Sequence, residues 1–144
     1  MNTIFIICGH GNYGTGFQST IELLLGKKED IYYIDFLVED NDITLKEKML
    51  EIINQNPNSQ ILFICDILGG TPYKVAAEIA NFNNSIEVIV GCNVMSIIEG
   101  SFQKDNLALE ELANFIVESS KNSTIKFEKV KGKELINEVV EEGI

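Results

Sequence analysis

The sequence predicts a single α/β domain built on a doubly wound, mainly parallel β-sheet with helices on both faces. Apolar, β-branched runs typical of strands alternate along the chain with segments whose apolar residues recur at helical spacing. The strand runs contain few polar residues, as expected where helices cover both faces of a sheet. A length of 144 residues fits one domain with a full hydrophobic core, and we expect residues 1–144 to form that domain.

The amino-terminal third of the chain predicts a strand, a loop and a helix. Residues 3–8 contain the unbroken apolar run Ile4-Phe5-Ile6-Ile7-Cys8, which indicates a buried strand. The glycine-rich residues 9–16 follow as a loop. Helical spacing then predicts a helix over 17–25, and Gly26 is a natural C-terminal cap for it.

The middle of the chain continues the alternation. A second strand is predicted at 31–36, followed by an amphipathic helix over 43–54 with Asp42 or Thr44 as its N-cap. Residues 61–65 are apolar and predict the third strand.

A second glycine-containing loop, residues 66–71, precedes the third predicted helix. Thr71 is a good N-cap for this helix, and Pro72 suits its first position because proline lacks the amide that is unpaired there. The helix is predicted to run to about Asn81, and the fourth strand follows at 86–90.

The carboxyl-terminal third predicts a helix at 107–119, a short strand at 125–127 and a last helix at 133–140. The short strand follows the helix at 107–119 with no further helix between them. It therefore lacks the right-handed crossover that would place it as a parallel strand in the same sheet. We therefore expect 125–127 to pair antiparallel at an edge, or to pair with a second subunit.

Charge and composition restrict the partners. A net charge of -11 argues against nucleic acid and an anionic membrane surface, because both are bound by clustered lysines and arginines. The same charge favours a basic protein partner, and equally fits a role in solubility alone. No apolar run is long enough to cross a bilayer, so we expect a cytoplasmic protein. We expect Cys8, Cys65 and Cys92 to be buried free thiols.

His10 and Asp66 are the candidate catalytic residues. His10 is the only histidine, and it follows the first predicted strand, as Asp66 follows the third. If these two strands are neighbours, both residues lie at the switch point where α/β sheets bind ligands. Imidazole is a nucleophile with a free pKa near neutrality, so it can accept and release a phosphoryl group. A carboxylate on its second nitrogen would fix the tautomer.

Four further residues support this site. Gly11, Gly69 and Gly70 leave room for a partner and its phosphate to approach the backbone. The Thr71 hydroxyl and the free amides of the helix that follows offer hydrogen bonds to phosphoryl oxygens.

Three other interpretations have less support. Gly9, Gly11 and Gly14 formally match a dinucleotide-binding loop, and Asp35 is consistent with a ribose contact, but a lone match of this kind is weak. A metal site of Cys8, His10, Cys65 and Asp66 is disfavoured because neighbouring strand residues point to opposite faces. A serine hydrolase is disfavoured because the chain has no G-x-S-x-G turn to hold a nucleophilic serine. We expect no metal and no organic cofactor.

The motifs Ile7-Cys8-Gly9-His10-Gly11 with Gly16, and Asp66-Ile67-Leu68-Gly69-Gly70-Thr71-Pro72, resemble those of the IIA domains of the mannose/fructose/sorbose family of the sugar phosphotransferase system (PTS). The resemblance spans the chain from the first strand to Asn93. It implies a cytoplasmic phosphotransferase whose His10 is phosphorylated by the carrier protein HPr and passes the group to a IIB subunit. Asp66 would be the hydrogen-bond partner of His10, and Thr71 a phosphate contact.

The resemblance also implies a homodimer with an exchanged C-terminal strand, and an indirect link to the membrane components IIC and IID. A IIA domain does not touch the sugar, so these residues do not identify the sugar. The chain departs from the family pattern at Lys74, where asparagine is usual, and at Val94-Met95-Ser96, where Leu-Pro-Met is common. No IIB domain follows, which suggests a free-standing IIA subunit. The alternative is a non-catalytic regulatory or binding module of the same fold.

Overall fold

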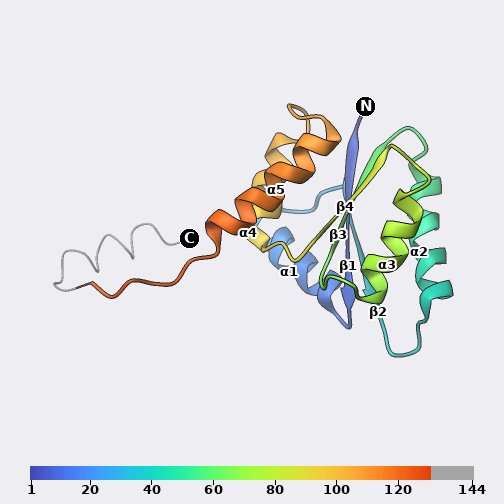
Figure 1. The fold of residues 1–144 in the computed structure, drawn as a ribbon, viewed down its shortest axis with the longest axis horizontal. Coiled ribbons are helices and arrows are strands. Elements are labelled where there is room, and N and C mark those ends of the chain that lie inside the picture. Colours follow the sequence, from blue (N-terminus) through green and yellow to red (C-terminus); the bar gives the residue numbers. More distant parts are fainter. Residues whose placement is uncertain (131–144) are drawn as a thin grey trace.

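A computed structural model describes residues 1–130, which form a four-stranded parallel sheet with helices on both faces (Figure 1). The elements in chain order are β1 (Thr3–His10), α1 (Tyr13–Leu25), β2 (Ile31–Phe36), α2 (Asp42–Gln55), β3 (Gln60–Cys65), α3 (Thr71–Ala80), β4 (Ile86–Val90), α4 (Val94–Gln103) and α5 (Leu109–Ser123). The predicted doubly wound α/β fold is confirmed for its four parallel strands.

The strand order is β2-β1-β3-β4, with parallel pairing throughout. From β1 the chain adds β2 on one side and then β3 on the other, so the strand order reverses between β1 and β3. In the β1–β3 register Cys8 lies opposite Cys65, and in the β1–β2 register His10 lies opposite Phe36. The residues that follow β1 and β3 therefore meet at the switch point, where open α/β sheets bind their ligands.

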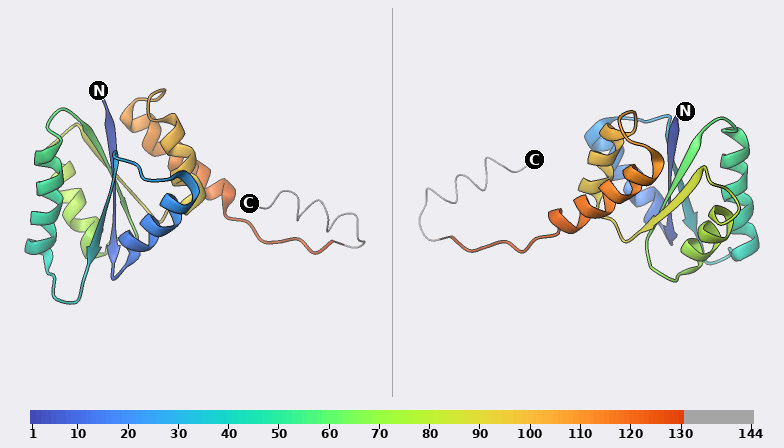
Figure 2. Two further views of the ribbon diagram at one scale, coloured as in Figure 1. Left: turned by 180° about the vertical axis from the view of Figure 1, so that it is seen from behind. Right: turned by 45° about the horizontal axis from the view of Figure 1, so that its top comes forward.

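Two helical layers enclose the sheet. Helices α1, α4 and α5 cover one face, and α2 and α3 cover the other (Figures 1 and 2). Successive residues of β1 alternate between the two cores: Phe5 and Ile7 pack with the first layer, and Ile4 and Ile6 with the second. Burial on both faces explains why the first strand is an unbroken apolar run. The cysteines Cys8, Cys65 and Cys92 are buried and free.

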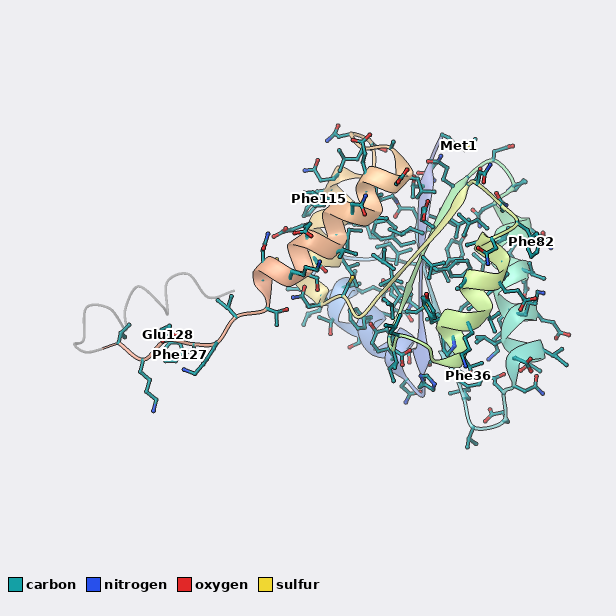
Figure 3. The ribbon with its side chains drawn as sticks, in the orientation of Figure 1. Met1, Phe36, Phe82, Phe115, Phe127 and Glu128 are labelled. Atoms are coloured by element: carbon teal, nitrogen blue, oxygen red, sulfur yellow. The ribbon has the colours of Figure 1, made fainter. Side chains whose placement is uncertain are left out.

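The predicted fifth strand is not present in this sheet. Residues 124–130 form no helix or strand and lead away from the body of the molecule (Figures 2 and 3). Ile125 is 83% exposed and Phe127 is 59% exposed. Among the described residues no neighbouring backbone pairs with 125–127, so the prediction of a fifth strand within one chain is wrong. The predicted helix at 133–140 lies outside the described residues.

The predicted loop at 9–16 is also wrong. Strand β1 continues to His10 and α1 begins at Tyr13, so only Gly11 and Asn12 connect them. Gly14 lies inside α1 for a packing reason, because a Cβ at this position would come within 2.6 Å of the Ile34 carbonyl oxygen. Glycine here permits close contact between helix and strand, although its local preference is for a loop.

Helix α4 was not predicted. Asn93 caps it by accepting a hydrogen bond from the Ser96 amide at 3.0 Å. Gly100, which suggests a break in a helix, lies against Ile116 of α5: a Cβ on it would come within 2.4 Å of that side chain. The glycine is therefore required where α4 and α5 pack.

Two predicted helix caps are displaced by one residue. The N-cap of α2 is Asn41, and Thr44 is the third helical residue of its capping box. The N-cap of α3 is Gly70, so Thr71 is the first helical residue and Pro72 the second. None of the helices formed by residues 1–130 has the length and hydropathy that a membrane span requires.

Candidate functional site

The carboxyl ends of β1 and β3 bring His10 and Asp66 into direct contact. Nδ1 of the imidazole lies 2.8 Å from Oδ2 of Asp66, and the same oxygen accepts a hydrogen bond from the backbone amide of His10 at 2.9 Å. The two residues are 56 positions apart in the sequence, and the adjacency of the two strands joins them. Sequence reasoning predicted this pairing on the condition that β1 and β3 are neighbours, and they are.

Backbone amides hold the Asp66 carboxylate in place. Its Oδ1 accepts a hydrogen bond from the Ile67 amide at 2.9 Å, while Oδ2 faces His10. The side chain of Asp66 is 9% exposed, whereas that of His10 is 43% exposed. Burial raises the pKa of Asp66, but hydrogen bonds from the amide and ring of His10 lower it more, so the pKa lies below its ordinary value. The carboxylate is therefore ionised at neutral pH.

This contact leaves Nε2 of His10 as the ring nitrogen that is not engaged with Asp66. An ionised carboxylate only accepts hydrogen bonds, so in the neutral ring the proton resides on Nδ1 and Nε2 carries the lone pair. Within residues 1–130, Nε2 has no hydrogen-bond partner. The arrangement presents a nucleophile to solvent and places a negative charge behind it to balance a positive ring.

Two neighbours restrict the imidazole on its other sides. The ring of Phe36 lies edge-on to it, with centroids 5.6 Å apart and an interplanar angle of 82°. The backbone of Gly70 lies against the Cε1 atom of the ring, because a Cβ on Gly70 would come within 2.9 Å of that atom. Sequence reasoning identified Gly70 but missed Phe36. The position of Phe36 follows from the register between β1 and β2, which the sequence does not display.

Glycines shape both loops of the site. Gly11 and Gly69 have φ values of +56° and +80°, in the left-handed region that favours glycine. Gly69 occupies the third position of a turn closed by the Gly70 amide on the Ile67 carbonyl at 3.1 Å, as in a type II turn. Gly9, which was not a predicted site residue, leaves the space for Tyr13 and the Asp66 carboxyl group. Its place directly before His10 in the Gly9-His10-Gly11 run is the signal that sequence reasoning had for it.

The start of α3 borders the imidazole. Gly70 touches the ring, and Thr71 is the first residue of the helix. The amide of Lys74 bonds to the Gly70 carbonyl at 2.9 Å, which leaves the amides of Thr71 and Tyr73 in the unpaired first turn. Such a helix N-terminus favours an anionic group on the neighbouring nitrogen.

A groove of about 610 Å³ extends from this point between α2 and α3. Phe36, Thr71 and Lys74 line it near the imidazole, and Figure 3 labels Phe36 beside the start of α3. Lys46 and Glu78, which also line the groove, form an ion pair at 2.9 Å. The site is thus open toward an approaching molecule.

The geometry disfavours a dinucleotide site. The Asp35 carboxylate accepts hydrogen bonds from the amide of Thr15 at 2.9 Å and from its hydroxyl at 2.7 Å. It therefore caps the first turn of α1, the place where a pyrophosphate would bind, and adds a negative charge there. Its oxygens are engaged with the helix, not presented to a ribose.

The buried thiols next to the site are poor ligands and nucleophiles. Burial is the main cause that raises the pKa of the Cys8 thiol to about 12, and it also raises the pKa of Cys65. Among residues 1–130, no group of three or more histidine, cysteine or acidic side chains is arranged to hold a metal ion.

Comparisons with known proteins relate the chain to one family. A model of the family described as the PTS system fructose IIA component matches residues 4–117. The fructose-specific EIIA component of Bacillus subtilis is 28% identical over 119 residues, which are 82% of each chain. The mannose-specific EIIAB component of Escherichia coli K12 is 32% identical over 122 residues, which are 83% of this chain but 38% of that protein. The mannose/sorbose-specific IIA subunit of Enterococcus faecalis has the same fold, with a TM-score of 0.83 at 20% identity over 92% of this chain and 100% of that one.

Proposed function

Because the chain belongs to the family of fructose, mannose and sorbose IIA components of sugar phosphotransferase systems, we propose that it is a phosphocarrier that uses His10 as its phosphoryl acceptor. The observation that carries the proposal is the contact of 2.8 Å between Nδ1 of His10 and Oδ2 of Asp66, beside the N-terminus of α3. It orients a half-exposed imidazole so that its free nitrogen faces outward.

In the proposed reaction the lone pair of Nε2 attacks the phosphorus atom of a phosphorylated donor. The bond between phosphorus and the donor breaks as the bond to Nε2 forms, and the proton on Nδ1 stays in place. The ring becomes cationic, and the Asp66 carboxylate stabilises that charge. The reverse steps pass the group to an acceptor, so His10 is regenerated in each cycle.

The surroundings of Nε2 supply the contacts for the transferred group. The free amides at the start of α3 and the hydroxyl of Thr71 are the donors that we assign to its oxygens. Gly11, Gly69 and Gly70 place no side chains around the imidazole, which allows a partner protein to reach it. None of these roles requires a metal or an organic cofactor.

We assign the donor as the carrier protein HPr and the acceptor as a IIB subunit, which in turn serves the membrane components IIC and IID. The reaction would take place in the cytoplasm. The net charge of -11 favours partners with a basic face, since complementary fields accelerate encounter. We further propose a homodimer in which residues 125–127, exposed in the single chain, pair with the second subunit.

The proposal is tested by incubating the full chain with phosphoenolpyruvate, enzyme I and HPr, followed by intact mass measurement. One phosphoryl group that is lost in acid is the expected product, and the His10→Ala variant should show none. A non-catalytic regulatory module of the same fold would remain unmodified under these conditions. Retention of the adduct in His10→Ala would assign the acceptor to another residue.

A further inference from the structure

The edge of the sheet that carries His10 has almost no positive charge. The chain contains no arginine, so its 11 basic residues are all lysines. In the described structure, the connections after the four strands and the first turns of the helices that follow them contain one lysine, Lys74. Two further lysines reach this edge from farther along α2, but Lys46 is paired with Glu78 and Lys48 with Asp40, each at 2.9 Å or less. Among the described residues near His10, Lys74 is therefore the cation without a carboxylate partner.

Lys74 is placed to reach that group. It is the fourth residue of α3, whose N-cap Gly70 touches the ring of His10. Side chains on a helix lean toward its N-terminus, so the stem of Lys74 leans toward His10. Lys74 also lines the groove together with Thr71 and Phe36, whose ring contacts that of His10.

The charge of Lys74 is not used within the described chain. Among residues 1–130, no carboxylate lies within ion-pairing distance of its Nζ, whereas the other lysine of the groove, Lys46, is paired with Glu78 at 2.9 Å. An exposed, unpaired lysine in the first helical turn also opposes the helix dipole, which favours anions there. The charge therefore gains no favourable interaction with the helix dipole and is available to an external anion.

We propose that Lys74 binds the phosphoryl group on Nε2 of His10 through a charge-assisted hydrogen bond. The inference rests on the proposed function and deepens it by assigning a phosphate contact to Lys74. The cation acts while the bond from phosphorus to the donor breaks and the bond to Nε2 forms, and it exchanges no proton.

The test uses two donors, phospho-HPr and phosphoramidate. With phosphoramidate the phosphorus–nitrogen bond of the reagent breaks, ammonia leaves, and no protein partner is needed. The full-length variants are Lys74→Gln, which removes the charge, Lys74→Arg, which keeps it, and Lys46→Gln as a matched control from the same groove. Intact mass gives the rate of phosphorylation, and thermal melting confirms that each variant folds.

With both donors, Lys74→Gln should be phosphorylated about 3- to 10-fold more slowly than the wild type, the size expected for a partly exposed charge contact. Lys74→Arg and Lys46→Gln should stay within about twofold of the wild type, and added salt should slow the wild type more than Lys74→Gln. Equal rates for Lys74→Gln and wild type with phosphoramidate would overturn the inference. A loss confined to phospho-HPr would also overturn it, because Lys74 would then contact the partner. If the wild type accepts no phosphoryl group from either donor, the proposed function itself fails.

Discussion

The backbone of Gly70 lies so close to the imidazole of His10 that a Cβ at position 70 would come within 2.9 Å of Cε1. The backbone of Gly70 is extended, with φ of -72° and ψ of 165°, so an alanine meets no conformational penalty there. The added methyl group would lie 3.3 Å from the Ile67 carbonyl oxygen but only 2.9 Å from Cε1, so its main effect would fall on the histidine ring.

For Gly70→Ala we predict a stability loss of about 1 kcal/mol, because alanine is a poorer N-cap than glycine for α3. We predict phosphoryl transfer slowed by about 10- to 100-fold, because the methyl group pushes the imidazole away from Asp66 and misplaces Nε2. Single-turnover phosphorylation and thermal melting measure the two effects separately. Gly16→Ala is the matched control, since its Cβ would meet nothing within 4 Å. A Gly70→Ala variant with wild-type transfer would show that the ring does not need its present position.

Gly100→Ala should destabilise the fold by about 1–3 kcal/mol, because its methyl group would overlap the fully buried side chain of Ile116 between α4 and α5. Gly16→Ala, in the open first turn of α1, should instead stabilise it by about 0.5–1 kcal/mol. Urea unfolding followed by circular dichroism compares the two. Equal effects from both substitutions would contradict the packing argument.

Asp66→Asn should retain binding to HPr but slow transfer by about 10²–10⁴-fold. An amide can accept the proton of Nδ1, but it brings no charge to balance the cationic ring. Rapid-quench measurement of the phosphorylation rate checks the prediction, and the affinity for HPr is the control. Wild-type rates would reduce Asp66 to a residue that only shapes the turn.

The same variant has a pH signature. Because the pKa of Asp66 is lower in the folded chain than in the unfolded one, its contribution to stability is complete above the ordinary carboxyl pKa of about 3.9. That contribution is lost as the pH falls through the folded pKa. Between pH 5 and pH 2, Asp66→Asn should therefore lose less stability than the wild type; an identical loss would contradict this assignment.

The exposed apolar residues Ile125 and Phe127 predict a dimer that depends on the segment after Ser123. Pairing of this segment with a second copy would bury both side chains and cover an unpaired sheet edge. Light scattering should give twice the chain mass of 16.1 kDa for the full chain, and the monomer mass for a chain truncated at Ser123. A monomeric full-length protein, or a truncated chain that dimerises equally well, would refute the exchanged strand.

Strands were predictable from the sequence because burial on both faces leaves an unbroken apolar run, as in β1. Helices could not be predicted where their local sequence signals conflict with the packing that they make. Gly14 and Gly100 suggest a loop and a break, yet each is a glycine because a neighbouring element leaves no room for a side chain. The Asn93–Ser96 capping pair was a visible signal for α4 that sequence reasoning did not use.

The candidate site also has a part that the sequence predicts and a part that depends on the arrangement of the strands. His10 and Asp66 were identifiable from their residue types and their places after two predicted strands. Their contact depended on the adjacency of β1 and β3, which is a property of the sheet and not of either motif. The ring of Phe36 reaches His10 only through the β1–β2 register, so no local pattern marked it.

The central claim, that Nε2 of His10 carries the phosphoryl group, is tested most directly by nitrogen NMR of the imidazole in the phosphorylated full-length protein. Asp66 holds Nδ1 at 2.8 Å, so the phosphoryl group should be bonded to Nε2 while Nδ1 keeps its proton. A group bonded to Nδ1 would mean that the contact with Asp66 breaks during transfer, and would contradict the role assigned to that carboxylate. The absence of any phosphorylated imidazole after exposure to phospho-HPr would contradict the account as a whole.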